Sequence, residues 1–294
     1  MKQSTALLAC VVVMSPALAS ADPFRPSMAD QVKLGADEAA RIRKEEPVLK
    51  ASDPRVIELR KIGAELVAAI PPNSMRGKPW TYTFDIIDKN EVNAFALPGG
   101  PIFFYSGILS NMTTKDQMAG VVGHEIVHVL NQHWASQYAD NTKRRLGILA
   151  VLTILNAGDT VFDLASVGDA LYSLGYSRKH ETESDKVGYE IMMRAGYNPN
   201  GMAEVFEVLA KEGGGGGPEW ARTHPDANKR VASIREMIKK ETRPLPAVRA
   251  RDAKSIAAGT TASPGERLPG KGGGTSLRPG GTQRSTPHWL DCGC

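Results

Sequence analysis

Two histidines and a glutamate, spaced as His-Glu-x-x-His, are the residues of this sequence best suited to chemistry. They are His124, Glu125 and His128, in a segment whose apolar pattern predicts a helix. Residues four apart on a helix lie about 40° apart around the axis, so both imidazoles can bind one divalent metal, usually zinc. Glu125 is then placed to take a proton from a water molecule. The motif predicts metal chemistry, and the alternative is an ordinary helix that carries these residues.

A second predicted helix, from Ser177 to Gly196, carries carboxylates that suit the same site. Glu181 and Asp185 share a face, whereas Glu183 points roughly the opposite way. A buried carboxylate pair needs a cation, and a catalytic zinc needs a third protein ligand. Glu181 can be that ligand, with Asp185 accepting a hydrogen bond from a ligating imidazole. The alternative is a solvated charged face.

Two of the remaining histidines, His224 and His133, lie outside these motifs. His224 follows a run of five glycines and stands at a predicted helix start, where its imidazole could reach a neighbouring cleft, and Arg230 comes one and a half turns later. His133 follows His128 by five residues, about 140° around a continued helix. We therefore predict His133 to be a surface residue outside the metal cluster.

The composition limits the class of protein and the ligands that a metal site could use. The 294 residues are 41% hydrophobic and 23% charged, which suits one globular domain with appendages. The net charge of +4 is too small to indicate a nucleic-acid partner. The three cysteines are Cys10, Cys292 and Cys294, all far from the central region. A metal there must therefore use nitrogen and oxygen ligands.

The elements that position the site have clear start signals. Ser52-Asp53-Pro54 predicts a helix that runs to Ile70, and Thr114 with Gln117 forms a capping box that starts the metal helix. Alternating residues from Tyr82 to Ile86 predict a half-buried strand.

An extended stretch on either side of Pro98-Gly99-Gly100-Pro101 predicts further strands. Prolines at such positions favour an edge strand or a bulge over a central strand. An edge strand beside a metal site could pair with an extended peptide, and the glycines could allow close backbone approach. A plain connecting turn is the alternative.

The ends of the chain differ from its centre. Residues 1–21 resemble an export signal peptide, and lipoprotein anchoring at Cys10 is disfavoured because the preceding apolar run is brief. The apolar run Leu146–Leu155 is too short to span a membrane and predicts a core helix or lid, with membrane-surface contact as the alternative. Residues 243–294 are rich in glycine and proline and predict a disordered tail.

These pieces, in this order, resemble the HtpX and CAAX-prenyl-protease family of zinc metallopeptidases (metallopeptidase family forty-eight, gluzincin), in its soluble periplasmic branch similar to BepA and Oma1. The resemblance rests on Asn93–Gly100, the His124–His128 motif, Ser177-Arg178 with Glu181 and Asp185, and Thr223-His224-Pro225 with Arg230.

The resemblance implies an α+β, mainly helical zincin-type domain over residues 22–242 (core about 35–240), with one small β-sheet. It implies one Zn²⁺ per chain, Glu125 as general base, and His224 near the reacting atoms as an oxyanion donor or a fourth ligand that keeps the enzyme latent. The remaining assignments are metal ligands His124, His128 and Glu181, outer contacts Asp185 and Arg230, and substrate-binding residues Phe95, Ala96, Leu97, Pro98, Gly99 and Gly100.

The implied activity is that of a zinc-dependent metalloendopeptidase hydrolysing misfolded or membrane-associated proteins in extracytoplasmic quality control. Its expected partners are protein or peptide substrates, with peripheral contact to a membrane or to outer-membrane assembly machinery also open, in a periplasmic protein without a transmembrane helix. The rival hypothesis is a metal-stabilised chaperone or assembly factor with a latent peptidase site. The intact Glu125 argues against that rival, because a purely structural metal site needs no base.

Overall fold

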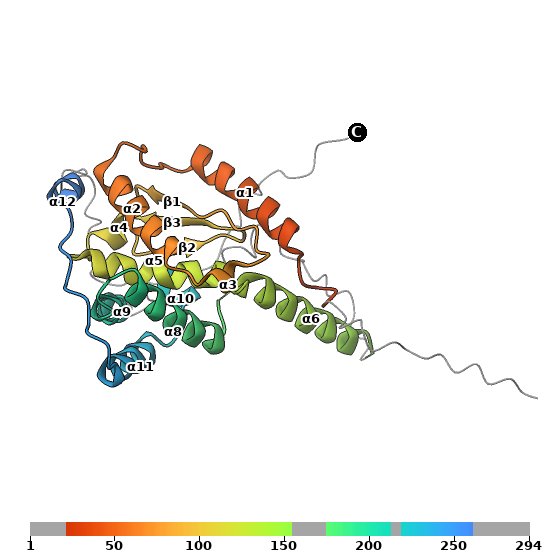
Figure 1. Ribbon diagram of the computed structural model, residues 1–294. Coiled ribbons are helices and arrows are strands. Elements are labelled where there is room, and N and C mark those ends of the chain that lie inside the picture. Colours follow the sequence, from red (N-terminus) through yellow and green to blue (C-terminus); the bar gives the residue numbers. More distant parts are fainter. Residues whose placement is uncertain (1–21, 155–174, 213–218, 261–294) are drawn as a thin grey trace, which may run out of the picture. The chain divides into compact units, whose positions relative to one another are not determined.

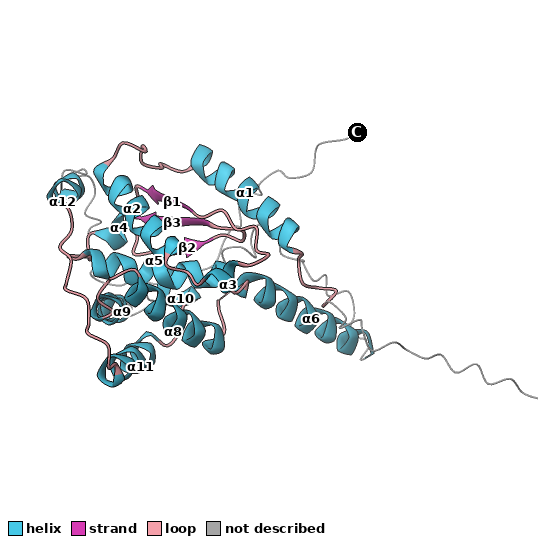
Figure 2. Cartoon of the chain, in the orientation of Figure 1, coloured by secondary structure: helices cyan, strands magenta, loops and turns pink. Residues whose placement is uncertain are grey.

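The computed structural model describes residues 22–154, 175–212 and 219–260, and these form a mainly helical unit with one three-stranded sheet (Figure 1). This arrangement confirms the predicted fold class (Figure 2). The predicted signal peptide, the glycine run at 213–217 and residues 261–294 lie outside the described residues.

The helices before the sheet are α1 (Met28–Glu45), α2 (Pro54–Ala68) and α3 (Pro72–Met75). The helices after it are α4 (Ser106–Leu109), α5 (Lys115–Leu130), α6 (His133–Ile154), α8 (Arg178–Arg194), α9 (Asn200–Glu212), α10 (Glu219–Thr223), α11 (Ala227–Lys240) and α12 (Ala253–Thr260).

The sheet consists of β1 (Thr83–Ile87), β2 (Ala94–Ala96) and β3 (Pro101–Tyr105), in the order β1-β3-β2. β3 pairs in parallel with β1 and antiparallel with β2. The predicted edge strand is therefore β2, whereas Pro101 begins the central strand. Pro101 is the first residue of β3, a position at which a central strand tolerates proline because the ladder starts there.

The metal helix α5 occupies the centre of the described unit. It begins as predicted, since the Thr114 side chain accepts a hydrogen bond from the Gln117 amide and the Gln117 side chain accepts one from the Thr114 amide. Every residue from Asp116 to Leu130 is buried, and α5 contacts α2, α8, α9 and β2. A Cβ at Gly120 would lie 2.6 Å from the Met202 Cα, so glycine is what lets α9 pack this closely.

The two glycines after β2 serve packing within the chain. Gly99 and Gly100 have backbone φ angles of 84° and 132°, which residues other than glycine rarely adopt. A Cβ at Gly99 would lie 2.7 Å from the Val32 Cα in α1, and one at Gly35 would lie 1.7 Å from the Pro98 carbonyl oxygen. The close backbone approach expected from these glycines is thus made by α1.

The predicted disordered tail does not begin at residue 243, because residues 243–260 pack on the domain. Arg251 is buried and contacts Glu58 of α2, with Nε 3.0 Å from Oε2. The amide of Arg249 donates to Asp116 at the start of α5, at 2.6 Å. Composition does not reveal this packing, because one buried ion pair and a few hydrogen bonds of backbone amides, rather than an apolar period, hold this segment.

The apolar run after Leu146 lies only partly within the described side chains. Leu146 itself is 44% exposed on α6, so a core helix is not supported at that position. Within residues 22–154, 175–212 and 219–260, no helix combines the length and the apolar character that crossing a membrane requires.

Candidate metal centre

Four buried side chains meet beside the middle of α5. His124 and His128 come from α5, Glu181 from the first turn of α8, and His224 from the turn between α10 and α11. One nitrogen or oxygen atom of each lies within 4.8 Å of those of the other three. The structure therefore gathers the three predicted ligands and His224 in one place.

The spacing of these atoms suits a tetrahedral zinc ion. The two Nε2 atoms of His124 and His128 are 2.9 Å apart, and the Nε2 of His128 is 3.4 Å from Glu181 Oε1. His224 Nδ1 lies 3.2 Å from His124 Nε2. Zinc bound at about 2.0–2.1 Å by each ligand requires ligand atoms about 3.3 Å apart. The donor set, nitrogen and carboxylate oxygen, is also the one that zinc accepts.

Glu125 lies beside this cluster and has no hydrogen bond to the described residues. Both of its carboxylate oxygens are buried, and Oε1 lies 3.5 Å from His224 Nε2. Burial raises the pKa of the Glu125 carboxyl group. A buried carboxylate with free acceptor capacity and a raised pKa suits proton transfer to and from a water molecule.

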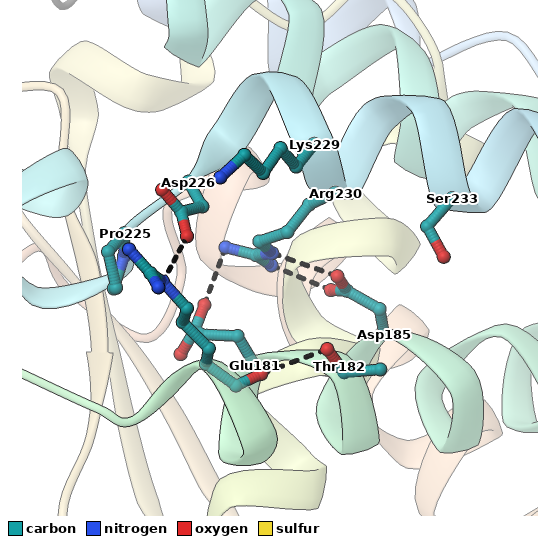
Figure 3. Close-up of a pocket in the computed structure, with 9 residues that line it drawn as sticks. Glu181, Thr182, Asp185, Pro225, Asp226, Lys229, Arg230 and Ser233 are labelled. Atoms are coloured by element: carbon teal, nitrogen blue, oxygen red, sulfur yellow. Dashed lines mark hydrogen bonds and ion pairs between the residues drawn. The ribbon is translucent and has the colours of Figure 1, made fainter.

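Arg230 pairs with two carboxylates of α8, those of Asp185 and Glu181 (Figure 3). Asp185 Oδ1 lies 3.0 Å from His124 Nδ1, and the Arg230 guanidinium binds both carboxylate oxygens of Asp185 at 2.7 and 2.8 Å. Arg230 Nη1 also lies 2.6 Å from Glu181 Oε2. These contacts orient one imidazole and one carboxylate toward the same point.

The charges around Glu181 keep it ionised. Burial alone would raise its pKa, but His224 and the Arg230 guanidinium hold the pKa of Glu181 well below its ordinary value. Burial lowers the pKa of His128 well below its ordinary value, so this imidazole is neutral. An ionised carboxylate and a neutral imidazole are the forms that bind a metal.

Three aromatic residues that the sequence analysis missed enclose the cluster. Tyr176 stacks on His128 with ring centroids 3.8 Å apart, and Trp220 stacks on His224 at 4.9 Å. Phe206 lies under the Arg230 guanidinium at 4.3 Å. Two of the three had a local signal: Tyr176 directly precedes the Ser177 cap, and Trp220 precedes His224 by four residues.

The prediction that His133 is a surface residue is wrong. Helix α5 ends at Leu130, and Gln132 has a left-handed φ of 54°, so the chain turns before His133 begins α6. The extrapolated helix phase therefore does not apply. His133 is 2% exposed, and its Nδ1 lies 3.1 Å from His128 Nδ1.

Glu183 lies outside the metal cluster. Its position two residues after Glu181 on a helix predicted that it would point away from that side chain. Its side chain is 42% exposed and accepts a hydrogen bond from the Asn131 amide group at 2.7 Å. Its other oxygen lies 3.4 Å from His133 Nε2. Glu181 and Glu183, two positions apart in α8, therefore face different surroundings.

The predicted substrate-binding residues form β2 and the turn after it. Phe95 is half-buried and stacks on Phe103, whereas residues 96–100 are buried. β2 is an edge strand and contacts α5. Of these six residues, Phe95 alone is partly exposed.

Comparison with known proteins matches these features to one family. The model of Peptidase family M48 matches residues 57–238, which is more than half of the chain and includes the whole cluster.

Several named proteins are similar to this chain. Mitochondrial metalloendopeptidase OMA1 of Arabidopsis thaliana is 33% identical over 49% of this chain and 29% of its own length. A putative beta-barrel assembly-enhancing protease of Vibrio cholerae is 29% identical over 79% of this chain and 52% of its own. Metalloprotease LoiP of Escherichia coli is 31% identical over 56% of this chain and 66% of its own. The chain thus spans about half or less of the length of the first two relatives.

Proposed function

Since the chain belongs to peptidase family M48, we propose that it is a zinc-dependent metalloendopeptidase that hydrolyses misfolded or membrane-associated proteins in extracytoplasmic quality control. The observation that carries this proposal is the buried cluster of His124, His128 and Glu181 with Glu125 beside it. The names of the relatives, which include metalloendopeptidase and protease, support the same activity.

His124, His128 and Glu181 would hold the zinc ion, which when bound polarises a scissile carbonyl and lowers the pKa of water toward about 7. Glu125 accepts the proton of the attacking water and later donates it to the leaving amine. The Glu125 carboxylate is buried and accepts no hydrogen bond from the described part of the chain, which leaves it available for both transfers. Asp185 and Arg230 keep His124 and Glu181 in position during the reaction.

The edge strand β2 is the proposed site for the substrate backbone. An extended peptide can add to an open sheet edge through main-chain hydrogen bonds, which select for unfolded segments rather than for one sequence. Of the six residues assigned to substrate binding, Phe95 has the exposure to contact a side chain. The buried residues Ala96–Gly100 would then have a structural role, as the end of β2 and the turn that follows it.

Export to the periplasm is the proposed location, and it rests on residues 1–21, whose sequence has the features of a signal peptide. Peripheral contact with a membrane or with outer-membrane assembly machinery is part of the same proposal. The name of the Vibrio cholerae relative, a beta-barrel assembly-enhancing protease, is the support for that contact.

A metal-stabilised chaperone or assembly factor is the second candidate. The observation that favours it is His224, because a fourth protein ligand closes a zinc site, as in structural sites. Under this hypothesis the protein binds unfolded polypeptide and zinc but does not cleave.

Metal removal tests the proposed function. We expect a strong chelator to abolish cleavage of an unfolded polypeptide, and one equivalent of zinc per chain to restore it, because ligands preformed by the fold bind the ion again. Metal analysis and gel-based cleavage measure both. Zinc binding without cleavage, in the wild type and in His224→Ala, would favour the chaperone.

His224→Ala distinguishes two roles for this side chain. As a fourth ligand it holds the enzyme latent, and its removal should raise turnover by opening a position for water. As a hydrogen-bond donor to the developing oxyanion it aids catalysis, and its removal should lower turnover about a hundredfold. The short distances from its Nδ1 to His124 and Glu181, 3.2 and 3.1 Å, favour latency. Steady-state kinetics decide, and unchanged kinetics would contradict both roles.

A further inference from the structure

The two histidines of the metal motif have different partners behind their rings. His124 Nδ1 faces the carboxylate of Asp185 directly, at 3.0 Å. Among the residues that the structure describes, His128 Nδ1 faces no carboxylate; it lies 3.1 Å from Nδ1 of His133, another imidazole. The second nitrogen of His133 lies 3.4 Å from Glu183 Oε2. On its Nδ1 side, His128 therefore reaches a carboxylate through His133.

Metal binding fixes the direction of hydrogen bonding along this line. A neutral imidazole that binds a metal through Nε2 carries its proton on Nδ1. His128 Nδ1–H must then donate, and His133 Nδ1 must accept with its lone pair. His133 consequently carries its proton on Nε2, the atom that faces Glu183. The three groups are compatible only in this one arrangement.

The opposite tautomer of His133 conflicts with metal binding. In that tautomer the hydrogen on His133 Nδ1 would lie near both Ser184 Oγ, 3.3 Å from the nitrogen, and His128 Nδ1. Two hydrogens would then face each other between His128 and His133, whose nitrogens are 3.1 Å apart. The Ser184 hydroxyl can rotate to suit either case, so it does not decide the tautomer.

The surroundings of His133 keep its ring in this position. It is 2% exposed, and His180 of α8 stacks on it with centroids 4.4 Å apart and planes at 13°. Asn131, in the turn before it, donates to Glu183 and holds that carboxylate near the ring. These contacts hold the His133 ring with its Nδ1 directed at His128 Nδ1.

Building on the proposed function, we propose that His133 is a positioning residue for the metal, fixing the tautomer and orientation of His128 and passing its hydrogen bond on to Glu183. Groups that orient ligating histidines raise metal affinity, and their loss costs about 10–100-fold. His133 itself does not contact the metal position, because its Nδ1 faces the far side of the His128 ring.

Two variants of matched shape test this role. His133→Leu removes the acceptor, and we expect the zinc dissociation constant, measured by chelator competition, to rise about 10–100-fold. His133→Asn places an amide oxygen near the position of Nδ1 and should keep an affinity close to that of the wild type. His180→Ala removes the ring that stacks on His133 but no hydrogen bond to His128, so it should weaken zinc binding less than His133→Leu.

A second measurement reads the tautomer directly. In the zinc-free protein, nitrogen-15 NMR of histidine side chains should find His128 protonated on Nδ1 in the wild type and in His133→Asn. In His133→Leu the proton should move to Nε2, which can donate to Glu181 Oε1 at 3.4 Å. Thermal unfolding of each zinc-free variant shows whether it is folded.

The outcomes separate this proposal from the proposed function. Equal weakening of zinc binding in the Leu and Asn variants, or an unchanged His128 tautomer in both, would overturn the positioning role while leaving the peptidase activity intact. A wild-type protein that binds no zinc would overturn both proposals. An affinity loss confined to His133→Leu, together with the tautomer change, supports the positioning role.

Discussion

Glu125→Gln should retain its zinc and lose turnover by roughly a hundredfold to ten-thousandfold, the usual effect of removing a general base. Glutamine has nearly the same shape, so the ligands on either side of it in α5 stay in place. It cannot accept the proton of the attacking water, and no other carboxylate of the cluster is free: Glu181 is committed to Arg230, at 2.6 Å. Metal analysis and kinetics on an unfolded polypeptide measure the two properties separately.

Glu190→Gln is a suitable control for this substitution. Glu190 is an exposed glutamate of α8 that pairs with Arg243 at the surface, so its loss should change neither zinc content nor turnover. Equal activity of wild type and Glu125→Gln would show that Glu125 is not the base and would remove the peptidase mechanism. Loss of zinc in Glu125→Gln would instead indicate that the substitution disturbs the ligands.

Local sequence signals predicted the parts of the fold that depend on neighbours along the chain. Thr114 and Gln117 form the capping box that starts α5, and Asp53 with Pro54 starts α2, because caps involve residues within one turn. The spacing of His124 and His128 determines that both face one side of the helix. Such features need no tertiary information.

Features that depend on contacts between distant segments could not be predicted. Residues 243–260 carry no apolar period, and they are held by single buried contacts such as Arg251 to Glu58, which lie 193 positions apart. Pro101 suggests an edge, but the strand order places β3 in the centre. Neither fact has a local cause.

His133 is the residue of the metal centre whose position could not be predicted from local sequence signals. Its predicted position assumed that α5 continues past Leu130, whereas the helix ends and Gln132 takes a left-handed conformation. Composition does not demand that break, since glutamine is not a typical residue for it. His133, three positions beyond the end of α5, therefore lies in the buried wall of the metal centre and not at the expected surface.

Glu181→Gln should weaken zinc binding by more than about a hundredfold, since the loss of a ligand exceeds the loss of a group that only orients one. The carboxylate is 1% exposed and its Oε1 faces His128 Nε2, so it has no role at the surface. Glutamine keeps the volume and can still contact Arg230, which limits any effect on folding. Its neutral amide oxygen is a far poorer zinc ligand than a carboxylate.

Glu183→Gln is the matched control, on the same helix and two positions away. Its side chain is 42% exposed, and glutamine can still accept a hydrogen bond from His133 Nε2, so zinc content should stay nearly unchanged. Metal analysis after dialysis, with unfolding curves for both zinc-free variants, makes the comparison. If Glu183→Gln loses zinc and Glu181→Gln keeps it, Glu181 is not the third ligand. The ion would then have to be held by His124, His128 and His224, the other members of the buried cluster.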